Sequence, residues 1–295
     1  MSFAKLKQQS GKKSLEQLTT QLTKLSGTQE SKSDDRFWYP EVDKAGNGYA
    51  IIRFLPAPGS EDVPFVRVWG HGFKGKSTGL WYIENSLSTI GKPDPVGEYN
   101  TQLWNSTTDD NSPARKQARD QKRKLTYISN VYVVSDPAKP QNEGKVFLFK
   151  YGKKIFDKLK EAMEPQFADE EAINPFDLWA GANFKLKIRN LEGYRNYDKS
   201  EFADKSALYD GDDAKLEELW KKEYSLAEFV EKKQFKSYEQ LKGRLDKVLG
   251  FDGAQVASSR KATDEPISLT EADVSALDNV EQDEDLDYFK SLATS

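Results

Sequence analysis

Short segments with the residue pattern of β-strands are the feature that most limits what this chain can fold into. Glycine, proline and aspartate turns bound them, and five cover residues 49–55, 65–69, 80–83, 125–134 and 145–151. A sixth segment, residues 183–191, places apolar side chains on one face and cationic ones on the other. The sequence therefore predicts a β-rich core.

Helical periodicity returns at three places. Leucines at three-and-four spacing predict a short amphipathic helix within residues 12–25. Further helices are predicted over residues 154–163 and within residues 214–250, where Ser225 with Glu228 and Ser237 with Gln240 have the spacing of capping boxes. Residues 86–114 are turn-rich and without periodicity, so we expect an irregular functional insertion there.

Charge is distributed unevenly along the chain. Residues 264–295 hold ten acidic side chains against one base, whereas residues 1–29 hold five bases against one acid. The basic N-terminal residues 1–29 are expected to bind a polyanion, and the acidic C-terminal residues 264–295 a basic partner. Residues 30–251 contain 36 bases and 36 acids, so nucleic-acid binding by this part must rest on local clusters.

Composition excludes several classes of protein. The chain has no cysteine and one histidine, His71, which excludes disulfide frameworks, thiol nucleophiles and mechanisms that need two imidazoles. No apolar run approaches the ~18 residues of a membrane span, and the first residues lack the apolar core of a signal peptide. We therefore expect a cytosolic protein that does not enter the membrane.

Residues 111–154 form the strongest candidate site, with eleven bases against three acids and aromatic residues between them. This mixture is typical of single-stranded nucleic-acid binding, in which cations follow the phosphates while rings stack on bases for ~1–3 kcal/mol each. Lys122, Arg123, Lys124 and Lys145 are the predicted phosphate contacts here, and Tyr127 is a predicted stacking platform. Some of the aromatic residues on strand 145–151 must instead be core.

Two further candidates follow the same logic. Residues 183–197 combine the cationic strand face with aromatic residues in a glycine turn, and their predicted contacts are Lys185, Lys187 and Arg195 for phosphates and Tyr194 and Tyr197 for bases. Residues 71–82 hold Lys74 and Lys76 beside Trp81 and Tyr82. This third signal is weaker, because neighbouring strand residues point to opposite faces and only one of the two rings can be exposed.

Two rival functions stay open on the residues alone. Paired acids such as Asp109 and Asp110 are compatible with a carboxylate-metal nuclease, although such pairs are usually solvated surface. A protein-only adaptor that binds partners through its basic head and acidic tail is the other alternative.

Six stretches have a distinctive order and spacing: AGNGYAIIRFLP (45–56), HGFK (71–74), WYIE (81–84), DPAKPQNEGKVF (136–147), YGKKIFDK (151–158) and GANFKLKIRNLEGYRNYD (181–198). Together they resemble the single-stranded DNA-binding proteins of T-even-type bacteriophages. The resemblance covers roughly residues 12–250, and the acidic tail has its counterpart too.

The resemblance implies an α+β, β-rich protein with an OB-fold, a five-stranded partly open barrel, and C-terminal helices. It implies a cooperativity arm at residues 1–29, a DNA-binding core at 30–251 with a small inserted subdomain at about 70–114, and a disordered linker and acidic tail at 252–295. Family members coat DNA strands cooperatively in replication, recombination and repair inside the infected host cell, and they are not enzymes.

Particular residues match the motifs of that family. Self-association is attributed to a basic motif that Lys12, Lys13 and Ser14 resemble in short form. The tail recruits replication and recombination proteins and competes with DNA, and the corresponding acids here are Asp278, Glu281, Asp283, Glu284, Asp285 and Asp287.

One departure concerns a metal. The type member of the family holds zinc with one histidine and three cysteines, and His71 matches the histidine. Ser86, Asp94 and Gly97 fall approximately where the thiolates are expected, so we expect zinc to be lost and no cofactor to replace it. Other contacts, such as inward packing of Tyr99 and Trp104, must then hold the insertion.

Overall fold

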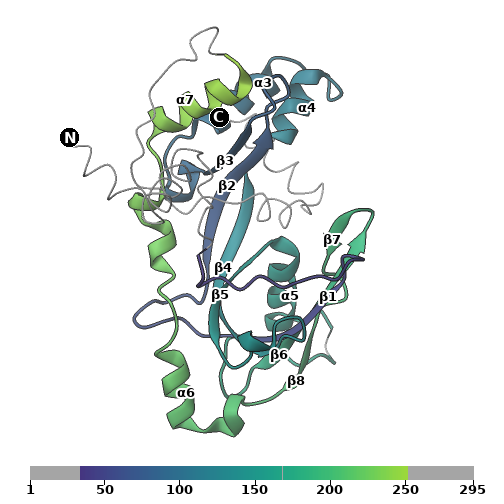
Figure 1. Ribbon diagram of the computed structural model, residues 1–295, viewed down its shortest axis with the longest axis vertical. Helices are drawn as coiled ribbons and strands as arrows, with labels where there is room; N and C mark the ends of the chain where they lie inside the picture. The colour runs from purple at the N-terminus through teal and green to yellow at the C-terminus, as the bar shows by residue number, and fades with distance from the viewer. Residues whose placement is uncertain (1–33, 168, 252–295) are drawn as a thin grey trace, which may run out of the picture. The chain divides into compact units, whose positions relative to one another are not determined.

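The computed structural model describes residues 34–167 and 169–251, whose strands form one curled antiparallel sheet (Figure 1). The order is β3-β2-β4-β1-β6-β7, with β5 beside β4 and β8 beside β6. This half-barrel confirms the predicted α+β, OB-like fold. The strands are β1 Gly48–Phe54, β2 Val66–Lys74, β3 Trp81–Asn85, β4 Lys124–Ser135, β5 Val146–Tyr151, β6 Ala182–Leu191, β7 Tyr194–Asn196 and β8 Glu201–Lys205.

The main core lies on the concave side of this sheet. The apolar face of β6, carried by Phe184, Leu186 and Ile188, is buried there as its alternation predicts. Phe54 of β1 contacts four other rings, among them Phe184 at 5.8 Å between ring centroids. Aromatic packing therefore fixes the barrel, and the cationic side chains of β6 are left on its outer face.

Residues 86–114, predicted to be irregular, contain helices. They form η1 Leu87–Ile90 and α3 Pro95–Asn105, and α4 Pro113–Asp120 begins before they end. Each α-helix starts with a capping side chain followed by proline, Asp94 before α3 and Ser112 before α4. The prediction was wrong because it relied on apolar periodicity, which these short polar helices lack. With the ends of β2 and β3 and with α7 (Tyr238–Leu249) they surround a second hydrophobic core, and we call this region the insertion.

A short helix, η2 Pro140–Asn142, lies between β4 and β5. The chain after β5 supplies the remaining helices: α5 Lys153–Met163, η3 Leu208–Gly211, α6 Asp213–Trp220, η4 Ala227–Val230, η5 Lys232–Gln234 and α7 Tyr238–Leu249. Segment 213–249 runs along the outer face of the sheet and ends on the insertion (Figure 1). The capping box of Ser237 and Gln240 is confirmed. That of Ser225 is wrong, since its hydroxyl donates to Glu61 instead.

Helix α7 completes the core of the insertion. Leu241, Leu245 and Val248 pack against Phe73 and Tyr82 of the β2–β3 hairpin. The buried carboxylate of Glu84 on β3 accepts from Lys236 at 2.8 Å and faces Arg244 at 3.0 Å, which ties the hairpin to the helix. The insertion therefore depends on residues that lie about 150 positions later in the chain.

The predicted helix within residues 12–25, the basic arm and the acidic tail lie outside the described residues. Within residues 34–167 and 169–251, no helix is both long and apolar enough to cross a membrane.

Candidate nucleic-acid interface

The basic triplet that the sequence marked lies where α4 passes into β4. Lys122, Arg123 and Lys124 are half-buried, and the Arg123 guanidinium lies 4.3 Å from the centroid of the Trp69 ring on β2. A guanidinium over an indole face is held by cation–π attraction. The triplet is thus fixed at the junction of barrel and insertion.

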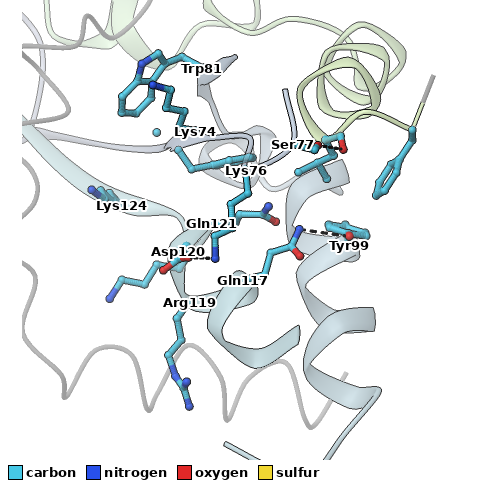
Figure 2. Close-up of a pocket in the computed structure, with 15 residues that line it drawn as sticks. Lys74, Lys76, Ser77, Trp81, Tyr99, Gln117, Arg119, Asp120, Gln121 and Lys124 are labelled. Carbon is cyan, nitrogen blue, oxygen red and sulfur yellow. Dashed lines mark hydrogen bonds and ion pairs between the residues drawn. The ribbon is translucent and has the colours of Figure 1, made fainter. Parts of the chain in front are cut away.

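A pocket of about 670 Å³ opens beside this triplet, and we call it the insertion pocket (Figure 2). Its cations come from three places in the sequence: Lys74 and Lys76 from the β2–β3 hairpin, Arg119 from the end of α4, and Lys122 and Lys124. Its acid, Asp120, pairs with Lys76 at 2.8 Å. Converging lysines with little opposing charge favour an anionic ligand.

Residues 71–82, the third candidate from the sequence, therefore line the same pocket as residues of the first candidate, 111–154. Trp81 lines the insertion pocket with 37% of its surface exposed, whereas Tyr82 is fully buried beneath it. The expectation that only one of these two rings is exposed is confirmed. Burial also raises the pKa of the Tyr82 phenol far above its usual range.

The second candidate forms the β6–β7 hairpin. Its turn, Glu192 and Gly193, has positive φ at both residues, as a two-residue turn between strands requires. Tyr194 is 56% exposed directly after the turn. Tyr197 is half-buried against the main core, and this burial raises the pKa of its phenol. The hairpin thus offers one open ring and one that is partly covered.

Among the cations of the second candidate, residues 183–197, Lys187 forms an ion pair. Lys187 Nζ lies 2.7 Å from Glu201 Oε1 on β8, while Lys185 and Arg195 are half-buried nearby on β6 and β7. Lys145 is exposed at the start of β5, where its carbonyl accepts from Val133 N–H. That places Lys145 near the opposite end of β4 from Lys124. The predicted phosphate contacts therefore come from separate parts of the sheet.

Tyr127 is not the exposed platform expected from the sequence. Its side chain is 6% exposed and stacks on Phe156 of α5 at 4.0 Å between ring centroids, with Tyr151 on β5 beside it at 5.7 Å. Position 127 falls on the concave face of β4, where an aromatic ring becomes core. Phe149 and Tyr151 are buried in the same cluster, as expected for some rings of that strand.

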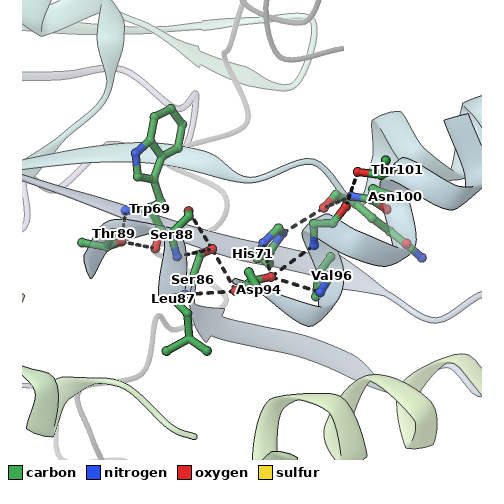
Figure 3. Close-up of polar contacts among 12 residues, drawn as sticks. Trp69, His71, Ser86, Leu87, Ser88, Thr89, Asp94, Val96, Asn100 and Thr101 are labelled. Carbon is green, nitrogen blue, oxygen red and sulfur yellow. Dashed lines mark hydrogen bonds and ion pairs between the residues drawn. The ribbon is translucent and has the colours of Figure 1, made fainter. Parts of the chain in front are cut away.

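The positions that correspond to zinc ligands in the resembling family meet in this structure (Figure 3). His71 Nδ1 lies 2.9 Å from the carbonyl oxygen of Gln121, and Nε2 lies 3.2 Å from Asp94 Oδ1. Asp94 also accepts hydrogen bonds from Ser86 Oγ at 2.9 Å and from Gly97 N at 3.2 Å. Both ring nitrogens of His71 therefore lie close to oxygen atoms of the protein.

This arrangement does not fit a zinc site. A zinc ion needs several donor side chains around the ring nitrogen, whereas Gly97 contributes only a backbone N–H and Ser86 a neutral hydroxyl that donates to Asp94. In the part of the chain that the structure describes, no group of three or more His, Asp or Glu side chains is placed to hold a metal ion. Burial favours the neutral acid, yet hydrogen bonds from His71 and Ser86 lower the pKa of Asp94 to about 2.

The acids of the nuclease alternative have structural contacts. Asp109 Oδ1 accepts from Asn111 N at 2.9 Å, and Asp110 pairs with Arg115. Arg115 in turn lies 4.3 Å from the centroid of the Trp104 ring, and Tyr99 packs against the core of the insertion. These contacts account for both acids as parts of the loop between α3 and α4.

Lys12, Lys13 and Ser14 lie outside the described residues, as do the six acids assigned to partner binding, from Asp278 to Asp287. Gln121, which lines the insertion pocket, was missed by the sequence analysis because a single glutamine at the end of a helix carries no pattern.

Comparisons with known proteins give a consistent result. The family model described as gp32 DNA binding protein like matches residues 46–249. The single-stranded DNA-binding protein of Enterobacteria phage T4 is 39% identical over 263 residues, which is 85% of this chain and 84% of the relative. That of Enterobacteria phage T2 is 40% identical over 264 residues, with the same coverage.

Proposed function

The chain belongs to the family of gp32-like DNA-binding proteins, and from this membership we propose that it is a sequence-tolerant coat for single-stranded DNA in phage replication, recombination and repair. The observation that carries the proposal is the convergence of Lys74, Lys76, Lys122 and Lys124 on one pocket beside the exposed Trp81. Tyr194, exposed on the β6–β7 hairpin, adds a second ring for a base.

The physical basis is counterion release together with stacking. Lysines that neutralise phosphates release condensed cations, so affinity falls by a slope of roughly 0.7 per phosphate on a plot of log affinity against log salt. Rings stack on any base, which gives binding without sequence readout. Lys185, Lys187, Arg195 and Lys145 would extend the contacts beyond the insertion pocket.

The test is a fluorescence titration of the full chain with poly(dT) at several salt concentrations. We expect a steep loss of affinity with added salt, and binding that is indifferent to salt would contradict the phosphate contacts. Incubation of labelled DNA with magnesium or manganese tests the nuclease alternative, because a coat protein leaves the DNA intact. An adaptor without DNA contacts would show no fluorescence change with any oligonucleotide.

The parts outside the described residues complete the proposal. Residues 1–29 would mediate cooperative self-association through Lys12, Lys13 and Ser14. Deleting residues 1–20 should leave affinity for a short oligonucleotide nearly unchanged while abolishing clustering on long strands, as seen by electron microscopy. Residues 252–295 would serve as linker and acidic tail, which recruits replication and recombination proteins in the infected cell and competes with DNA.

The cluster of His71, Ser86 and Asp94 would hold the insertion in place of zinc, with no cofactor. Its support is that all three side chains are buried and joined by short contacts. Metal analysis of the purified protein tests this directly, since stoichiometric zinc would refute it.

A further inference from the structure

Two side chains at the insertion pocket are not explained by packing alone. Trp81 begins β3 opposite Lys74 and keeps 37% of its surface exposed, although Tyr82 and Ile83 after it are buried. Gln121 is only 4% exposed, and its side-chain oxygen Oε1 is buried without a hydrogen-bond partner. A buried acceptor without a donor typically costs about 1–3 kcal/mol. The pocket thus has one exposed aromatic ring and one buried acceptor without a donor.

The residues around the Trp81 ring and Gln121 Oε1 indicate which kind of ligand would fit the pocket. Lys74 and Lys124 line the pocket and give it positive charge (Figure 2). Gly72 of β2 also lines it and contributes only backbone atoms. The backbone carbonyl of Gln121 is already taken by His71 and by Asn100. Its side-chain amide is therefore the part of the residue that faces the pocket, among the cationic side chains. A ligand with a flat ring, an N–H donor and a negative charge satisfies all of these groups.

We propose that the insertion pocket is a nucleotide subsite, where Trp81 stacks on one unpaired base and Gln121 Oε1 accepts a hydrogen bond from its Watson–Crick edge. The inference rests on the proposed function, since the nucleotide is a residue of the bound strand. All four bases carry an N–H donor on that edge, and in duplex DNA this donor is already paired. The orphan acceptor therefore favours single strands over duplex without selecting a sequence.

The test compares full-length variants on an oligonucleotide of about 10 nucleotides, within the ~4–16 nucleotides that an OB-fold covers. Trp81→Ala should weaken binding by about 5- to 100-fold, the equivalent of one stacked base. Trp81→Phe keeps a ring and should restore most of the affinity. Trp179→Ala is the matched control, because Trp179 is 55% exposed and its indole N–H donates to Asp213, away from the pocket.

Gln121→Leu tests the acceptor. Leucine keeps the volume and removes the orphan oxygen, so thermal stability should not fall while affinity drops about 3- to 30-fold, as expected for one hydrogen bond to a ligand. The deficits of both variants should vanish on an abasic oligonucleotide of the same length, which retains the phosphates and lacks the bases. A deficit that persists on the abasic strand would overturn the base contact.

Failure of the inference is distinguishable from failure of the proposed function. If the unaltered protein binds the strand and both variants bind it equally well, the subsite is refuted while the coat function stands. If the unaltered protein binds no strand at all, the proposed function itself is refuted. A 5-bromouracil oligonucleotide gives a second readout: photocrosslinks should map to the peptide that contains Trp81, and crosslinks confined to other peptides would contradict the subsite.

Discussion

At the scale of single residues, two buried carboxyl groups have opposite environments. Asp94 accepts hydrogen bonds from Ser86, Leu87, Val96 and Gly97 and faces His71, so its charge is stabilised although it is buried. Glu223 lies buried with neither carboxylate oxygen hydrogen-bonded. Its burial, with the nearby charge of Glu61, raises the pKa of Glu223 to about 9. One carboxyl supports the insertion and the other opposes folding at neutral pH.

Glu223→Gln should therefore stabilise the protein above pH 5. The folded state binds the Glu223 proton more tightly than the unfolded state, so stability is lost as the pH rises from the usual carboxyl value toward about 9. The neutral glutamine removes this loss, and we expect a gain of about 1–2 kcal/mol at pH 8. Urea unfolding at pH 5 and pH 8 measures it. Glu218→Gln, exposed on α6, is the control, and an equal gain there would contradict the explanation.

Asp94→Ala should destabilise the insertion by about 2–4 kcal/mol, because it leaves several buried donors without an acceptor. The melting temperature, measured with a chelator present, should fall accordingly. Asp110→Ala is the comparison, since its carboxylate is largely exposed and an exposed ion pair contributes about 0–1 kcal/mol. Equal effects of the two substitutions would show that the cluster around His71 does not support the fold.

At the scale of elements, the turn between β2 and β3 packs closely against the end of α7 and hydrogen-bonds to it. Thr78 Oγ1 donates to the Val248 carbonyl at 2.5 Å, and Ser77 Oγ donates to that of Leu249 at 3.0 Å. These hydroxyls satisfy carbonyls that the last turn of a helix leaves unpaired. A Cβ at Gly75 would lie 2.0 Å from the Val248 carbonyl oxygen, so only glycine permits this approach.

Gly75→Ala should accordingly cost about 1–3 kcal/mol, since backbone atoms must separate to admit the methyl group. Gly243→Ala is the matched substitution within α7, where the new Cβ meets nothing within 4 Å. It should stabilise the protein by up to about 1 kcal/mol through helix propensity. Thermal denaturation of both variants measures the difference, and a neutral Gly75→Ala would mean that hairpin and helix are not closely packed.

At the scale of the whole molecule, the insertion pocket and the C-terminal residues of the sequence carry opposite charges. Residues 264–295 carry ten acids and one base, whereas the insertion pocket gathers cations around a single acid that is already paired. Opposite charges joined by a linker attract one another at a high effective concentration. We therefore expect such a tail to compete with phosphates for the same lysines.

Deleting residues 264–295 should therefore tighten single-stranded DNA binding, and the gain should shrink as salt rises because screening weakens both attractions. Titration of both proteins with the same oligonucleotide over a range of salt measures it. A chain in which Asp278, Glu281, Asp283, Glu284, Asp285 and Asp287 are replaced by their amides serves as the matched control. It should reproduce most of the gain, and unchanged binding in both would argue against competition by the tail.

The sequence by itself determined the strands, the capping box before α7 and the residue classes that a single-stranded DNA-binding surface needs, because these depend on local periodicity and composition. Only the tertiary structure decided which of those residues are available. Tyr127 became core and Trp81 stayed exposed, although both sit on strands with the same pattern. Alternation shows that two faces differ, but what covers each face comes from distant segments such as α5 and α7, and contacts of that range leave no periodic trace in the sequence.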